Sequence, residues 1–173
     1  MMRRFVETDG ELTVLGRKLV KIMAGAYALA ICFMCFLPQS WYASPKEFQT
    51  PGIIQVDRFF FLFIPFNSFV NADKLDNLVD FFWVLLQNAT NIFLLYPLVL
   101  ALLCLFEKWR SVKKVLLYSF CMSFCIECTQ LLLDWLINAE RVFEIDDLWT
   151  NTLGGLLAYG SYHFLKKWIQ EKD

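Results

Sequence analysis

The side chains best suited to chemistry stand inside a long apolar stretch of the sequence. Ser123, Glu127, Gln130 and Asp134 are separated by four, three and four residues, so they share one face of an α-helix. A carboxylate near the centre of a bilayer costs about 2.5 to 3.5 kcal/mol on insertion scales. We therefore expect Glu127 to face protein or water, where a carboxyl group can bind a ligand or act as a general acid or base.

A second set of polar residues surrounds this stripe in the sequence. Arg141 precedes Asp146 and Asp147, and Asn151 follows Asp147 by one helical turn. Two amides, Asn88 and Asn91, lie in the first half of another apolar run. Our candidate binding residues are Asn88, Asn91, Ser123, Glu127, Gln130, Arg141, Asp146, Asp147 and Asn151. Among them, Glu127, Asp147 and Arg141 are also candidate catalytic residues.

The composition shows what must position these groups. Of 173 residues, 58% are hydrophobic and 17% aromatic, and the mean hydropathy is +0.47. A soluble core of this size cannot bury so much apolar surface, which excludes a soluble globular protein. The formal net charge of -1 lacks the basic field of a nucleic-acid-binding protein, so we expect no nucleic-acid partner.

Four apolar runs are candidates for membrane crossing, which requires about 20 residues in a helix. They cover about residues 20–38, 81–106, 115–137 and 148–165. The segment 59–70, FFFLFIPFNSFV, is too short to cross and contains Pro65, so we expect an interfacial or re-entrant segment. The predicted fold is an all-α integral membrane bundle of four transmembrane helices, forming one domain over residues 1–173 with the lipid bilayer as its first partner.

The distribution of Lys and Arg predicts the orientation of the bundle. Twelve of the 16 basic residues lie in the two terminal tails and in the connection 107–114, and four lie in the other two connections. The positive-inside rule then places both termini in the cytoplasm. In this orientation, the polar residues of the last three spans all fall toward the outer side, and three helices direct them into one outward-facing region.

Two interpretations of this polar region remain open from the residues. It could be a functional pocket, in which Glu127 is offset by Arg141, accepts hydrogen bonds from Asn91, Gln130 or Asn151, or is itself protonated. Alternatively, the polar groups fasten the helices together, and Gly154 and Gly155 allow a close approach. We favour the pocket because a scaffold needs no ionised cluster on one side.

These polar residues also carry a family resemblance. The segments Asn91-Ile-Phe-Leu-Leu-Tyr-Pro97, Ser123-Phe-Cys-Ile-Glu127-Cys-Thr-Gln130 and Arg141-Val-Phe-Glu-Ile-Asp-Asp147-Leu-Trp-Thr-Asn151-Thr-Leu-Gly154-Gly155 resemble the VanZ family of small bacterial membrane proteins. The resemblance extends from about residue 20 to 165. Val99, Glu144 and Ala158 stand where the family usually has Gly, Asp and Gly.

The resemblance implies a phenotype more than a reaction. The family is named for resistance to teicoplanin and related lipid-bearing glycopeptides, which act outside the membrane on cell-wall precursors. We therefore expect a multi-pass protein of the bacterial plasma membrane, typical of a Gram-positive cell envelope. Its expected partners are a lipid-linked peptidoglycan precursor, a lipoglycopeptide or another envelope lipid.

Two classes of function fit these expectations. The first is a binding module with an outward-facing intramembrane pocket. The second is a membrane enzyme that modifies an envelope lipid, with Glu127 or Asp147 as general acid or base and Arg141 holding an anionic group. The sequence contains no G-x-S-x-G, phosphate-binding glycine loop or H-E-x-x-H motif, so we favour binding and expect no cofactor and no metal site.

The orientation leads to a first prediction. In a background without the six native cysteines, a cysteine at Glu140 should react with a membrane-impermeant maleimide in intact cells, because it lies in an outer connection. A cysteine at Lys113 should react only after the cells are permeabilised. Labelling of Lys113 but not of Glu140 in intact cells would reverse the orientation.

Overall fold

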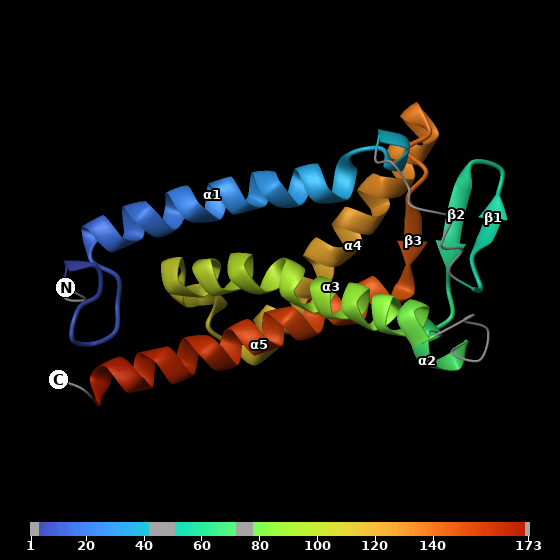
Figure 1. The fold of residues 1–173 in the computed structure, drawn as a ribbon. Coiled ribbons are helices and arrows are strands. Elements are labelled where there is room, and N and C mark those ends of the chain that lie inside the picture. Colours follow the sequence, from blue (N-terminus) through green and yellow to red (C-terminus); the bar gives the residue numbers. More distant parts are fainter. Residues whose placement is uncertain (1–3, 42–50, 72–77, 172–173) are drawn as a thin grey trace.

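Four long helices form the framework of the molecule. The computed structural model describes residues 4–41, 51–71 and 78–171. Within these ranges, the long helices are α1 (Val14–Phe36), α3 (Leu78–Leu105), α4 (Val112–Ile137) and α5 (Ile145–Gln170). Both termini lie at one end of the bundle (Figure 1), which we call the termini end. The four helices match the four expected runs within a few residues at most boundaries.

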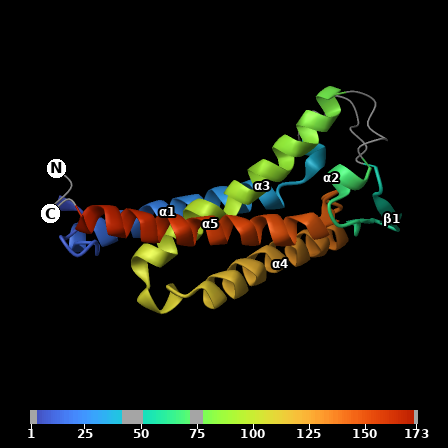
Figure 2. The same ribbon diagram turned by 90° about the horizontal axis from the view of Figure 1, so that it is seen from below.

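Three of these helices are long and apolar enough to cross a membrane: α1, α4 and the part of α3 over Leu85–Leu105. Helix α5 is not among them, and its crossing remains a prediction. It begins with Asp146 and Asp147 and carries Thr150 and Asn151 in its next turn. Helix α5 packs against both α3 and α4, which diverge on either side of it in Figure 2. Its polar residues therefore face protein, and α5 needs less apolar surface than the other helices.

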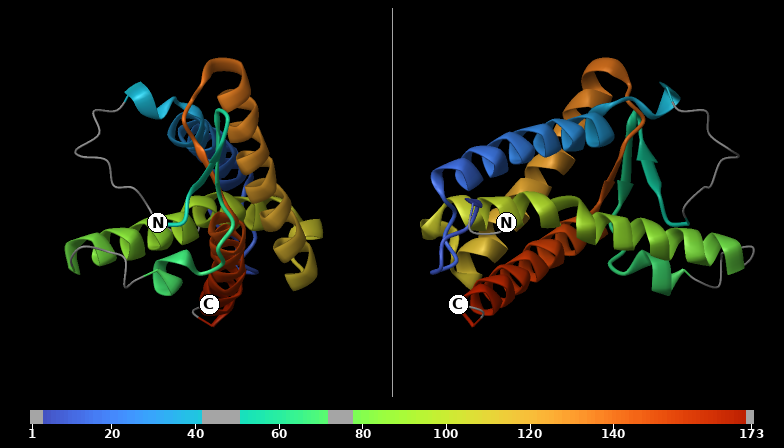
Figure 3. Two further views of the ribbon diagram at one scale, coloured as in Figure 1. Left: turned by 90° about the vertical axis from the view of Figure 1, so that its right-hand side faces the viewer. Right: turned by 60° about the vertical axis from the view of Figure 1, so that its left-hand side comes forward.

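A small β-sheet lies at the opposite end from the termini, which we call the sheet end (Figure 3). Its strands are β1 (Ile54–Val56), β2 (Phe59–Leu62) and β3 (Val142–Glu144). Strand β1 pairs antiparallel with β2 through a tight turn in which Asp57 has φ 56. Strand β2 pairs in parallel with β3, with Phe61 opposite Phe143. The sheet order is β1-β2-β3.

The sheet modifies the expectation for residues 59–70 and for a purely α-helical chain. This segment forms β2, a turn, and the one-turn helix α2 (Asn67–Val70), and its expected interfacial or re-entrant position stays a prediction. Aromatic residues favour strands, and pairing with β1 and β3 satisfies the backbone groups of β2 on both sides. The sequence did not predict these strands, because the partner strand β3 lies some 80 residues away in the sequence.

The termini end is closed by an ionic cluster centred on Glu11. Arg110 donates two hydrogen bonds of 2.7 Å to the two Glu11 carboxylate oxygens, and Lys166 donates a third. The guanidinium of Arg110 also lies 5.0 Å from the centre of the Tyr162 ring. Hydrogen bonding from Arg110 lowers the pKa of Glu11 to about 2 despite partial burial. The cluster joins the N-terminal segment to α5 and to the connection between α3 and α4, which contains the short helix η4 (Glu107–Trp109).

The helices pack around an apolar core with two close backbone approaches. Leu95, Val99 and Leu103 of α3 are buried together with Val115 of α4. A Cβ atom at Gly154 would overlap the carbonyl oxygen of Ile92, and one at Gly155 would overlap the Ser119 hydroxyl. The expectation that Gly154 and Gly155 permit close helix approach is therefore confirmed.

These contacts generate a second prediction. Gly154→Ala should lower the apparent melting temperature of the purified protein, because the added methyl meets the backbone of α3 and overpacking costs about 1 to 3 kcal/mol. Gly160→Ala is the matched control on the same helix, since a Cβ there meets nothing within 4 Å. This control should be neutral or stabilising, because Ala is the better helix former. Equal melting temperatures for the two variants would contradict the close approach.

Candidate functional site

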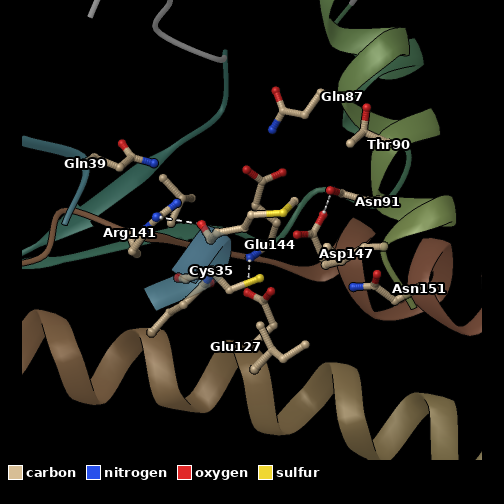
Figure 4. A pocket seen from close by; sticks show the side chains of 15 residues that line it. Cys35, Gln39, Gln87, Thr90, Asn91, Glu127, Arg141, Glu144, Asp147 and Asn151 are labelled. Carbon is tan, nitrogen blue, oxygen red and sulfur yellow. Dashed lines mark hydrogen bonds between the residues drawn. The ribbon is translucent and has the colours of Figure 1, made fainter. Parts of the chain in front are cut away.

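A polar cavity of about 170 Å³ lies near the sheet end, between α1, α3, α4, β3 and α5. Figure 4 shows carboxylate and amide side chains directed into it from several of these elements. Its lining residues are Met34, Cys35, Gln39, Gln87, Thr90, Asn91, Leu94, Ile126, Glu127, Gln130, Arg141, Val142, Glu144, Asp147 and Asn151. We call this cavity the acidic pocket, because three of its side chains are carboxylic.

The polar stripe of α4 faces the interior as the spacing predicted. Ser123, Glu127, Gln130 and Asp134 are all buried, and Glu127 is only 1% exposed. Oε2 of Glu127 accepts a hydrogen bond of 3.0 Å from the backbone N–H of Glu144. Gln130 donates to the carbonyl oxygen of Cys35 at 3.1 Å. The stripe thus joins α4 to β3 on one side and to the last turn of α1 on the other.

Arg141 occupies the pocket wall but does not neutralise Glu127. The two residues form no ion pair, although both lie in the described part of the chain. The Arg141 guanidinium donates to the carbonyl oxygens of Met34 and Leu37, and its backbone N–H donates to Asp134 at 2.9 Å. Carbonyl groups at the end of a helix have no intrahelical partner, so Arg141 caps α1.

The amides proposed as partners of Glu127 also bond elsewhere. Asn91 of α3 donates to the carboxylate of Asp147. Asn151 donates to the Ser123 hydroxyl at 2.9 Å, and that hydroxyl donates to the Asp147 carbonyl oxygen at 3.0 Å. This chain links α3, α5 and α4 beside the pocket. The same group of residues therefore fastens the helices together by hydrogen bonds and helps to form the pocket.

Three members of the candidate set lie outside the pocket lining. Asp146 accepts hydrogen bonds from the backbone N–H groups of Phe66 and Asn67 and from the Trp149 indole. It therefore anchors α2 to α5. Ser123 is fully buried behind the lining, and Asn88 is on α3 but does not line the cavity. Six of the nine candidates do line it: Asn91, Glu127, Gln130, Arg141, Asp147 and Asn151.

The structure adds Glu144 to the site. Gln39, Gln87, Thr90 and Cys35 also line the pocket without having been candidates. Glu144 precedes Asp147 by three residues at the start of α5, and this spacing at a helix start is the signal that could have identified it. Burial raises the pKa of Glu144 above its ordinary value, and the neighbouring Asp147 and Asp146 carboxyl groups raise it further.

The raised pKa of Glu144 generates a third prediction. An acid whose folded pKa exceeds its unfolded value contributes stability at low pH that is lost as the pH rises through the folded pKa. The melting temperature of the purified protein should therefore fall as the pH rises above about 4.5. Glu144→Gln cannot ionise and should reduce this slope, whereas Glu140→Gln, at an exposed position, should keep it. An unchanged slope in Glu144→Gln would show that the carboxyl group is not buried.

Comparison with known proteins agrees with this arrangement. No curated protein and no solved structure gives a match to the chain. A family model described as VanZ/LLP1 matches residues 24–166. The matched region contains the whole acidic pocket, from Met34 to Asn151. It covers most of the chain, and the resemblance seen in the sequence is thereby confirmed: the protein belongs to the VanZ/LLP1 family.

Proposed function

We propose that this protein binds an amphiphile of the bacterial cell envelope, with the polar part of the ligand in the acidic pocket. The observation that supports the proposal most directly is the grouping of Glu127, Glu144 and Asp147 around one cavity. Among the described residues its only lining cation, Arg141, caps α1. Structural hydrogen bonds account for Glu127 and Asp147 but not for the gathering of three carboxyl groups around one open space. A ligand with hydrogen-bond donors would be stabilised there.

The size and lining of the pocket describe the ligand's polar part. A cavity of about 170 Å³ has room for on the order of ten water molecules, and hence for a sugar or a small amine. The side-chain oxygen of Asn151 is buried and finds no hydrogen-bond partner among the described residues. The pocket therefore has more hydrogen-bond acceptors than donors available to them. The pocket suits hydroxyl or ammonium groups of a lipid-linked precursor or lipoglycopeptide better than its anionic groups.

Family membership links the chain to antibiotic resistance. We propose that the relevant drugs are teicoplanin-type glycopeptides and that the acidic pocket opens toward the outside of the bacterial plasma membrane. Both termini would then lie in the cytoplasm, and α5 would be the fourth crossing. A pocket on the outer side can reach drugs and precursors that are held by lipid chains in the outer leaflet. Protection by binding or shielding requires no chemical step.

An enzymatic role is the second candidate, favoured by the raised pKa of Glu144 within the pocket. Against it, two of the carboxyl groups already have structural contacts, since Glu127 accepts the Glu144 N–H and Asp147 accepts the Asn91 amide. We therefore place binding first. Turnover of a defined envelope lipid by the pure protein would reverse this order.

The fourth prediction tests the pocket through the phenotype. Glu127→Gln and Asp147→Asn keep a hydrogen-bond acceptor for the Glu144 and Asn91 contacts but remove the acid. Each of these two variants, and Asn151→Ala as a third, should abolish protection against a lipid-bearing glycopeptide in a susceptible Gram-positive host. Membrane abundance of the variants should equal that of the parent, and protection should be greater against drugs with a lipid tail.

His163→Ala and Gly160→Ala are the controls, because both positions are on α5 and line no part of the acidic pocket. Both should protect like the parent. If the three pocket variants also protect at normal abundance, the polar cluster is scaffold alone. The growth-inhibition series must therefore compare strains that express each variant at matched levels.

A further inference from the structure

A second cavity, almost wholly apolar, lies beside the acidic pocket. It has a volume of about 370 Å³ and is lined from α1, α3 and α4, with Trp109 at the η4 turn. Its lining includes Ile31, Leu95, Leu98, Met122, Cys125 and Ile126, and none of the described residues that line it is charged. We call this cavity the apolar groove. Cys32, Cys121 and Cys125 are exposed along it.

The apolar groove and the acidic pocket follow one another in the same order on α3 and α4. On α1 the two linings overlap, because Met34 and Cys35 line the pocket and the next residue, Phe36, lines the groove. On α3, which runs the opposite way, Leu98 lines the groove and Asn91 the pocket. On α4, Met122 lines the groove and Gln130 the pocket. Helices α3 and α4 therefore place polar groups toward the sheet end and hydrocarbon toward the termini end.

The two cavities are also adjacent. Ile126 lines both of them, and the adjacent residues Leu94 and Leu95 of α3 divide between the acidic pocket and the apolar groove. A molecule with a polar end in the pocket therefore needs only to pass these residues to reach the groove.

The dimensions of the groove suit a hydrocarbon chain. From Ile126 to Tyr118 the groove follows α4 for about 12 Å. Over that length its lining is almost wholly apolar, as the hydrocarbon chain of an amphiphile requires.

We propose that the apolar groove holds the hydrocarbon chain of the same molecule whose polar part occupies the acidic pocket. This inference rests on the proposed function and deepens it, because it identifies the ligand as a single amphiphile held at both ends. The chain lies between α1 and α4, and the headgroup contacts Glu127, Glu144 and Asp147. The surrounding lipid tails are as apolar as the groove, so burial in the groove gives the chain no hydrophobic advantage over the bilayer. The groove instead fixes the position of the chain by packing, and the contacts of the headgroup determine which molecule binds.

Photo-crosslinking with two matched probes tests this placement. Both probes are decyl β-D-glucosides, whose sugar hydroxyl groups donate hydrogen bonds. One carries a diazirine at the end of the alkyl chain, and the other carries it beside the glycosidic oxygen. The full-length protein in phosphatidylcholine nanodiscs is irradiated with each probe, and the adducts are mapped by mass spectrometry. Chain-end adducts should fall at Leu98, Trp109, Tyr118 and Met122, and head-end adducts at Met34, Asn91 and Ile126.

Leu98→Trp fills the groove and should remove the chain-end adducts from it. Leu132→Trp is the matched control on α4, at an exposed position that lines neither cavity, and should leave the adducts in place. If head-end adducts map to the pocket while chain-end adducts scatter over the lipid-facing surface, the inference is overturned and the proposed function stands. If neither probe maps to its cavity, both fail. If Leu98→Trp does not fold, the adduct map of the protein without substitutions is sufficient to decide between these outcomes.

Discussion

The hydrogen bond from the Glu144 N–H to the Glu127 carboxylate determines how the sheet end of the molecule is assembled. It attaches β3 to the middle of the polar stripe on α4. Since β3 pairs with β2, it also places the hairpin of β1 and β2. Since α5 begins at the next residue, it sets where that helix enters the bundle. A carboxylate that is costly to bury thus holds backbone in place while lining the acidic pocket.

The polar stripe and the apolar runs could be predicted because they depend on local spacing. The periodicity of Ser123, Glu127, Gln130 and Asp134 placed them correctly on one buried face, and the runs located four helices. Six of the nine candidate residues line one cavity. The same local rules found the glycine pair, because small residues one after another on a helix are typical of close packing.

Pairings between distant residues could not be predicted in this way. Charge suggested that Arg141 would offset Glu127, but its guanidinium reaches the end of α1, more than 100 residues away. The parallel pairing of β2 with β3 also depends on contacts of high sequence separation. The position of Glu144 in the pocket also depends on that pairing, although its spacing from Asp147 at the start of α5 was a local signal for it. Spacing predicts which face a residue occupies, whereas the identity of its partner depends on how the faces assemble.

The contacts of Glu11 set an order in time as well as in space. Its partner Arg110 lies 99 residues later in the chain, and Lys166 lies 155 residues later. A ribosome must therefore synthesise the chain as far as Lys166 before the N-terminal segment can acquire both partners. Before that point, only Arg110 is available to Glu11. The complete ionic cluster can thus form only in a chain that already contains most of α5.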